Sequence, residues 1–304
     1  MAWSFEPGEA LHDAFRRVAA EEVARVRESL EDRDADRSNA IHGARQGFKR
    51  LRALLRLAEP ALGPDRKTAD RLLRDAGRRL SGLRDGTVRA EAFNEIVEGN
   101  GVDAPKREIG RLRVSVVGSG AQGDIEPNVA DALKLLGLAG AALDRLEWPE
   151  RRGELRRGLE KSQSRLRKSW KKARDEADSG AFHAWRKRVK DQAAQLRLFR
   201  RILPAGLRQR RDEEKATAEL LGKEHDLGLL LDRLPEGTLS PGMSSARRAF
   251  GDAIVRRRGA LQRDALAAGA AFSCVQPKAF AREVASAWEK GSKKTPRKTV
   301  QPSG

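Results

Sequence analysis

Residues 41–57, IHGARQGFKRLRALLRL, form the stretch that decides the fold. In an α-helix, side chains three, four and seven positions apart share a face, so this stretch would separate its apolar and basic residues. The apolar face holds Ile41, Phe48, Leu51 and Leu55, and the basic stripe holds His42, Arg45, Lys49, Arg52 and Arg56. No Asp or Glu occurs between His42 and Leu57, although a solvated helix face normally mixes both signs of charge. We therefore predict that one face packs on a core and the other attracts anions.

The whole chain shares this excess of positive charge. Its 304 residues include 62 Lys and Arg against 44 Asp and Glu, a formal net charge of +18. Such an excess predicts a polyanionic partner: nucleic acid, an anionic membrane surface or a phosphate polymer. The single cysteine, Cys274, excludes an internal disulfide framework and is typical of a reducing cytoplasm. Because the sequence shows neither a signal peptide nor a long apolar run, we expect a cytoplasmic protein without membrane insertion.

Helical periodicity recurs along almost the whole chain, so we expect an all-α fold. Ser38 or Asn39 is expected to cap the helix that contains the basic stripe, which should end before Pro60. The other helical regions are predicted at 9–31, 65–97 (broken or bent near Gly82 and Gly86), 104–117, 128–146, 150–178, 182–203, 207–234, 243–270 and 277–290. Residues 290–304 carry five basic residues and no acidic one, which predicts a disordered tail.

The two halves of the chain superimpose under one constant shift in numbering, without an insertion. This repeat shift places His42 on His183, Arg45 on Arg186, Lys49 on Lys190 and Arg56 on Arg197, and the apolar positions follow. It also pairs a second segment, LSGLRDGTV at 80–88, with LLGKEHDLGLL at 220–230. We interpret this pattern as a tandem duplication of a helical unit. It predicts two bundle halves, 1–141 and 142–290, followed by a basic tail at 291–304.

The paired segments resemble the repeated signature of the CHAD family, the conserved histidine α-helical domain. That signature is roughly His-x-x-Arg-x-x-x-Lys/Arg on one helix, followed later by Leu-Gly-x-x-x-Asp, and the likeness covers about residues 8–290. The resemblance implies two similar four-helix bundles related by a pseudo-twofold axis. It also implies that the equivalent basic helices line a positively charged groove or pore, which binds inorganic polyphosphate and in some relatives associates with polyphosphate granules.

Carried over by position, the resemblance implies phosphate contacts from residues in both halves. These residues are His42, Arg45, Lys49, Arg52 and Arg56, then His183, Arg186, Lys190 and Arg197. The second copy departs from the first, because Ala193 stands at the position of Arg52 and Asp191 at that of Arg50. We therefore expect the second half to bind phosphate less tightly. Many relatives carry an additional CYTH-type domain marked by Glu-x-Glu-x-Lys, and this motif is absent from the sequence, so its hydrolase activity is not transferred.

Other residues leave alternatives open. Asp85 and Asp226 suit a metal site or a carboxylate pair, although we prefer that each orients a basic side chain or caps a helix break. His225 is expected to add a basic group, and His42 and His183 to act either as neutral donors or as cations. The segment 118–123, GSGAQG, matches a dinucleotide-binding pattern, but no helix is predicted to open at its glycines. We interpret it as a turn between helices.

These observations predict a non-catalytic module that binds inorganic polyphosphate, without a metal or another cofactor. The alternative is a nucleic-acid-binding protein that uses the same basic surface, although no recognition motif is present. A solvated helix face is the simplest reading of the stripe, and its repetition in both halves argues against it. An enzyme acting on phosphate chains is disfavoured, because the sequence shows neither a Walker loop nor an acid/base set nor metal-ligand spacing.

Overall fold

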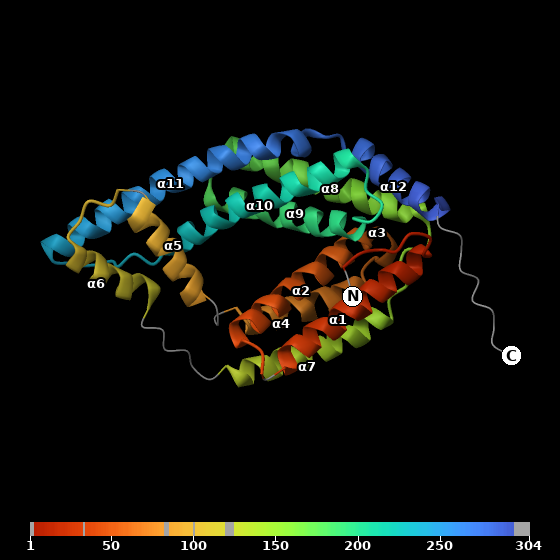
Figure 1. Cartoon of the computed structure of the whole chain (residues 1–304), viewed down its shortest axis with the longest axis horizontal. Coiled ribbons are helices and arrows are strands. Elements are labelled where there is room, and N and C mark those ends of the chain that lie inside the picture. Colours follow the sequence, from red (N-terminus) through yellow and green to blue (C-terminus); the bar gives the residue numbers. More distant parts are fainter. Residues whose placement is uncertain (1–2, 33, 82–84, 100, 119–124, 295–304) are drawn as a thin grey trace.

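The computed structural model describes residues 3–32, 34–81, 85–99, 101–118 and 125–294. These residues form twelve α-helices, and none of them lies in a strand. The predicted all-α fold is therefore confirmed. Two groups of helices lie side by side (Figure 1).

The first group is a bundle of four helices with the basic stripe on one of them. It consists of α1 (Leu11–Glu31), α2 (Arg37–Leu57), α4 (Arg66–Arg79) and α7 (Glu126–Asp144), with the short α3 (Glu59–Leu62) after α2. The apolar face predicted for α2 is buried in this core, and Phe48 and Leu55 are at most 1% exposed. Phe15 of α1 stacks on Trp148, with ring centroids 5.7 Å apart. Burying these large side chains is the main stabilising contribution to such a bundle.

The second group repeats this arrangement. It consists of α8 (Arg152–Glu176), α9 (Ser179–Leu198), α10 (Ala205–Leu231) and α11 (Pro241–Cys274), with α12 (Pro277–Lys294) packed on α8. Its core includes Phe182, Trp185 and Phe272. Helix α12 extends to Lys294, beyond the predicted start of the disordered tail at 291. The remainder of that tail, 295–304, lies outside the described residues.

Helices α5 (Asp85–Gly99) and α6 (Lys106–Val117) belong to the first half of the sequence but pack on the second group (Figure 1). Phe93 of α5 lies against Phe250 of α11, with ring centroids 4.5 Å apart. Helix α7 runs through residue 141, where the division between the two halves is predicted, and ends at Asp144. A periodic apolar pattern shows that a helix is half buried, but it does not show which helix covers it.

The helix bounds agree with the repeat shift. The shift carries α2 to 178–198, where α9 occupies 179–198, and it carries α1 to 152–172, where α8 occupies 152–176. The two basic helices also begin in the same way: Asp36 accepts a hydrogen bond from the amide of Asn39 at 2.8 Å, and Asp178 accepts one from Ala181 at 2.7 Å. That the halves arose by duplication stays a prediction.

Some predicted details are corrected. Asp36 caps α2 in place of Ser38 or Asn39, because an aspartate one residue before the helix can reach the exposed amide of Asn39. The helical region predicted at 65–97, broken or bent near Gly82 and Gly86, contains two helices, α4 and α5, which agrees with a break. Residues 82–84 between them lie outside the described part. Of the glycine-rich segment, Gly118 follows α6 with φ 87°, while residues 119–124 are not described.

The two groups approach each other closely where α8 meets the end of α2. A Cβ atom on Gly158 would lie 1.9 Å from the carbonyl oxygen of Leu57. No side chain other than hydrogen fits in that space. Gly158 therefore allows the backbones of the two groups to touch beside the basic helices.

Candidate anion-binding site

Helices α2 and α9 contact each other and bring together the basic residues of the two halves. The side-chain amide of Gln195 on α9 donates to the carbonyl oxygen of Ala53 on α2 at 3.0 Å. Lys49 and Lys190, which are equivalent under the repeat shift, lie close enough for the charge of Lys49 to lower the pKa of Lys190. Equivalent residues meet each other only near the axis of a twofold arrangement. The two basic helices therefore face one another.

Lys190 is the most perturbed cation of this contact. Burial, followed by the positive charges of Arg186 and Lys49, lowers its pKa to about 8, while Asp226 acts in the opposite direction. Lys187, one turn earlier on α9, also has a lowered pKa, first because of burial and then because of Arg188, Arg52 and Arg56. Cations from α2 and α9 thus repel one another across one shared space.

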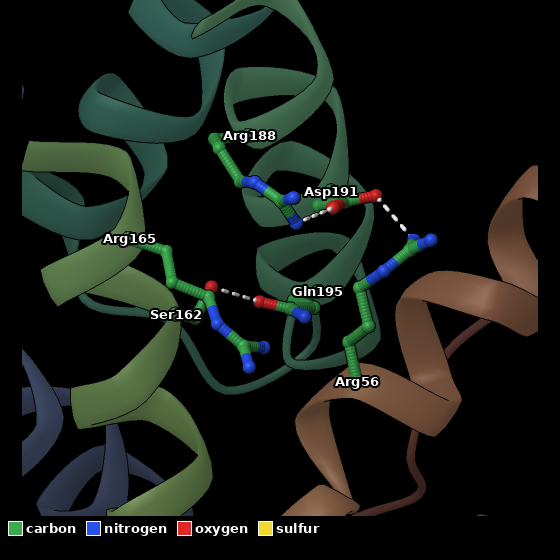
Figure 2. A pocket seen from close by; sticks show the side chains of 6 residues that line it. All are labelled: Arg56, Ser162, Arg165, Arg188, Asp191 and Gln195. Atoms are coloured by element: carbon green, nitrogen blue, oxygen red, sulfur yellow. Dashed lines mark hydrogen bonds and ion pairs between the residues drawn. The ribbon is translucent and has the colours of Figure 1, made fainter. Parts of the chain in front are cut away.

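Arg52 and Arg56 are held by carboxylates from other helices. Arg52 makes two hydrogen bonds to Asp70 of α4, at 3.0 and 3.2 Å. Arg56 donates to Asp191 of α9 at 2.9 Å (Figure 2). It also lies 3.7 Å from Asp70. Asp191 also accepts from Arg188 at 3.2 Å. The stripe has no acid on its own helix, but the fold supplies two, which fix the arginine side chains in place.

Arg45 and its counterpart Arg186 lie in different surroundings. Arg45 donates to the carbonyl oxygens of Leu80 and Ser81, at 3.1 and 2.8 Å, and so satisfies the end of α4. Arg186 cannot cap a helix end in this way, because α10 continues past the equivalent position at Leu221. Burial lowers the pKa of Arg186, and the charges of Asp226 and Glu224 partly offset that effect.

Two histidines meet beside these cations. The rings of His183 of α9 and His225 of α10 lie against each other, with centroids 4.5 Å apart and their planes tilted by 33°. Burial, followed by the charges of Arg186 and of His183, lowers the pKa of His225 to about 4, and burial also lowers the pKa of His183. Both rings are therefore neutral near pH 7. His225, which was expected to add a basic group, therefore adds no positive charge there.

The other four residues that the sequence singled out lie in different surroundings. His42 lies half buried on α2. The side chain of Asp85 lies outside the described part, and Asp226 acts on Arg186 and Lys190 through its charge. Arg197 lies apart from the lysines and arginines described above, since its charged neighbours are Arg50, Arg200, Glu22 and Arg25.

Lys187 and Arg188 are basic residues of the site that lie outside the predicted set. The repeat shift places them opposite Gln46 and Gly47, so the repeat gave no reason to choose them. Their closeness to Arg52 and Arg56 depends on how α9 crosses α2. The one signal in the sequence was that Lys187 and Arg188 lie on the same predicted helix as Arg186 and Lys190, between these two residues.

The described residues include no group of three or more His, Cys, Asp or Glu side chains that could hold a metal ion. In the same part of the chain, no helix is long and apolar enough to cross a membrane. The candidate site is therefore a cluster of cations with a few fixed carboxylates. Its chemistry suits the recognition of phosphate oxygens by Arg and Lys.

These features define an all-helical protein in which two bundles bring their basic helices together. A family model of the CHAD domain matches residues 9–235, about three quarters of the chain, so this chain belongs to the CHAD family. The crystal structure of the CHAD domain from the plant Ricinus communis is similar, with a TM-score of 0.62 and 18% sequence identity. The match covers 90% of this chain and 96% of the plant domain, and it supports the fold. No curated protein matches the sequence.

Proposed function

We propose that this protein binds inorganic polyphosphate along the facing cations of α2 and α9, and that this binding associates it with polyphosphate granules. The observation that carries the proposal is the environment of Lys190, whose pKa is lowered to about 8 by burial and by like charges from both helices. Assembling like charges in a half-buried space costs folding free energy. A bound polyanion would offset that cost and so would stabilise the folded protein.

The arrangement suits a polymer better than a single phosphate. Residues seven positions apart on a helix are separated by roughly 10 Å, so the cations of α2 form a row and not a point. Lys49 and Lys187 are exposed, whereas Asp70 and Asp191 already hold Arg52 and Arg56 in fixed orientations. A linear chain with a negative charge on every unit can contact several of these groups at once. Each contact would displace counterions and make the affinity fall with salt.

The decisive experiment is a competition assay with labelled long-chain polyphosphate bound to the full chain. Unlabelled polyphosphate, duplex DNA and single-stranded RNA are added at equal concentrations of phosphate and at several salt concentrations. We expect unlabelled polyphosphate to displace the label at much lower concentration than either nucleic acid. If DNA or RNA competes equally well, the protein is a general binder of nucleic acid and the proposal is wrong.

The affinity for polyphosphate should also depend on pH. In the free protein, Lys190 loses its proton as the pH rises through about 8, whereas a bound polyanion favours the protonated form. Affinity should therefore stay nearly constant below about pH 8 and fall about tenfold as the pH rises to about 9.5. Titration of each pH series by fluorescence anisotropy would measure this loss.

The matched variant for this experiment is Lys190→Arg. A guanidinium keeps its charge throughout the same pH range, so the affinity of the variant should remain nearly constant up to about pH 9.5. An equally steep decrease in Lys190→Arg would show that another group controls the pH dependence.

We further propose that binding is not accompanied by cleavage of the polymer. Incubation of the protein with polyphosphate, with and without Mg²⁺ or Mn²⁺, should release no phosphate above the level of the Lys190→Glu variant. Sustained release that depends on the wild-type site would identify an enzyme and overturn this part of the proposal.

A further inference from the structure

A second group of cations lies on α8, next to the contact between α2 and α9. Two of them, together with Arg66 of α4, converge on one carboxylate, that of Glu59 in α3. Arg66 lies 2.7 Å from Glu59 Oε1, Lys161 lies 3.0 Å from the same oxygen, and Arg165 lies 2.7 Å from Glu59 Oε2. We call these four residues the Glu59 cluster. It carries three positive charges and one negative charge.

Glu59 stays ionised under all physiological conditions. Burial alone would raise its pKa, but the close ion pairs with Arg165 and Lys161 and the charge of Arg66 lower it to about 2. The side chain of Glu59 is only 13% exposed, whereas those of Lys161 and Arg165 are 45% and 36% exposed. The carboxylate is therefore a fixed internal anion beneath two accessible cations.

Arg165 connects the Glu59 cluster to the proposed polyphosphate site. It lines a small hollow of about 10 Å³ together with Ser162 of α8, Arg56 of α2 and three residues of α9 (Figure 2). The residues of α9 are Arg188, Asp191 and Gln195. A hollow of this size has room for about one water molecule. A phosphate group would therefore lie over its opening and would not enter it. A phosphate group at the mouth of the hollow would have Arg56 and Arg188 on one side and Arg165 on the other.

The other half of the chain lacks this extension. The repeat shift places Lys161 and Arg165 opposite Ala20 and Ala24 of α1. These two alanines line a groove against Gly140 and Leu143 of α7, which is apolar for most of its length. At these two equivalent positions, α8 therefore carries cations where α1 carries alanines.

On this basis we infer that Lys161, Arg165 and Arg66 form a further phosphate subsite for the same polymer, in which Glu59 stands in for a phosphate unit. The inference rests on the proposed function and specifies it: a long chain would extend from α2 and α9 over the hollow onto α8. A chain of three phosphates would occupy the site between α2 and α9 alone. Contacts on α8 would therefore distinguish long chains from short ones.

The test compares binding of tripolyphosphate and of long-chain polyphosphate by the full-length protein. In the double variant Lys161→Gln/Arg165→Gln, affinity for the long chain should fall about tenfold or more, while affinity for tripolyphosphate should not change. The control variant Arg156→Gln/Lys171→Gln removes the same charges from exposed positions elsewhere on α8. It should change neither affinity by more than about twofold.

Glu59→Gln tests the role of the carboxylate separately. Because it removes an internal competitor for Lys161 and Arg165, it should increase affinity for the long chain several-fold. Glu219→Gln makes the same change in net charge at an exposed position of α10 and should have a smaller effect. If Glu59→Gln does not exceed this control, Glu59 does not stand in for phosphate and the inference is wrong.

The variant Lys190→Gln tests the proposed function separately from the subsite on α8. It should weaken binding of both tripolyphosphate and long-chain polyphosphate. If the double variant on α8 binds the long chain normally while Lys190→Gln weakens it, the subsite is refuted and the proposed function stands. If Lys190→Gln binds both polymers like the wild type, the proposed function itself is refuted. Circular dichroism and thermal unfolding of each variant would establish that it is folded.

Discussion

Reversing the charges of Lys49 and Lys190 together should weaken binding of polyphosphate about 1,000-fold at low salt. Two charge-assisted contacts with phosphate are worth about 4 kcal/mol in sum, and that free energy corresponds to a factor of about 1,000 in the dissociation constant. The two carboxylates would also repel the polymer at the centre of the contact between α2 and α9. The loss should become smaller as the salt concentration rises.

Lys49 is a better position for this variant than Arg45, although both belong to the stripe. Arg45 satisfies the carbonyl oxygens of Leu80 and Ser81, so its replacement would disturb the end of α4. Lys49 is exposed, and its reversal beside Lys190 replaces one pair of like charges by another. Isothermal titration calorimetry of the double variant would measure the effect on binding.

The control for this prediction reverses two exposed lysines on other helices. Lys106→Glu/Lys134→Glu lowers the net charge by the same amount, and the two residues lie on α6 and α7. Affinity in this control should fall less than about tenfold at physiological salt, since exposed charges beyond a Debye length are largely screened. Equal losses in the two double variants would mean that polyphosphate responds to net charge and not to the site.

Gly158→Ala adds one methyl group where α8 meets the end of α2, and it should cause a large loss of stability. The new Cβ would lie 1.9 Å from the carbonyl oxygen of Leu57, which is backbone and cannot rotate away as a side chain would. Helix α8 would have to move away from α2. We expect the free energy of unfolding to fall by about 3 kcal/mol, the upper part of the range for overpacked positions.

Gly153→Ala is the matched control on the same helix. A Cβ atom at Gly153 would meet nothing within 4 Å, so this variant should be neutral or slightly more stable. Thermal unfolding monitored by circular dichroism would compare the two, with a midpoint about 5 °C lower for Gly158→Ala. An unchanged midpoint would show that α8 and α2 tolerate a wider separation than their contact suggests.

The sequence predicted the helices well because their cause is local. The apolar residues of α2 recur at helical spacing, and Ile41, Phe48, Leu51 and Leu55 are all buried as predicted. The helix ends were less accurate. Asp36 caps α2, whereas Ser38 and Asn39 lie inside it, because neighbouring polar residues compete for the same exposed amides.

The electrostatic state of the basic stripe could not be predicted in the same way. Asp70 and Asp191, which pair with Arg52 and Arg56, are separated from them by 18 and 135 residues along the chain. Their effect depends on distances of a few ångströms between different helices. For the same reason, Lys187 and Arg188 were missed, and the burial that keeps His225 neutral near pH 7 was not foreseen.

What the sequence alone determined is therefore the set of elements and their faces: an all-helical chain, two equivalent basic helices and the excess of positive charge. These properties follow from residue type and helical spacing. Only the tertiary structure decided that α2 faces α9, that α5 and α6 cover α10 and α11, and that Glu59 lies among the cations of α8. Each of these depends on how helices distant in sequence pack, which helical periodicity does not specify, because a half-buried helix can be covered by any matching apolar surface.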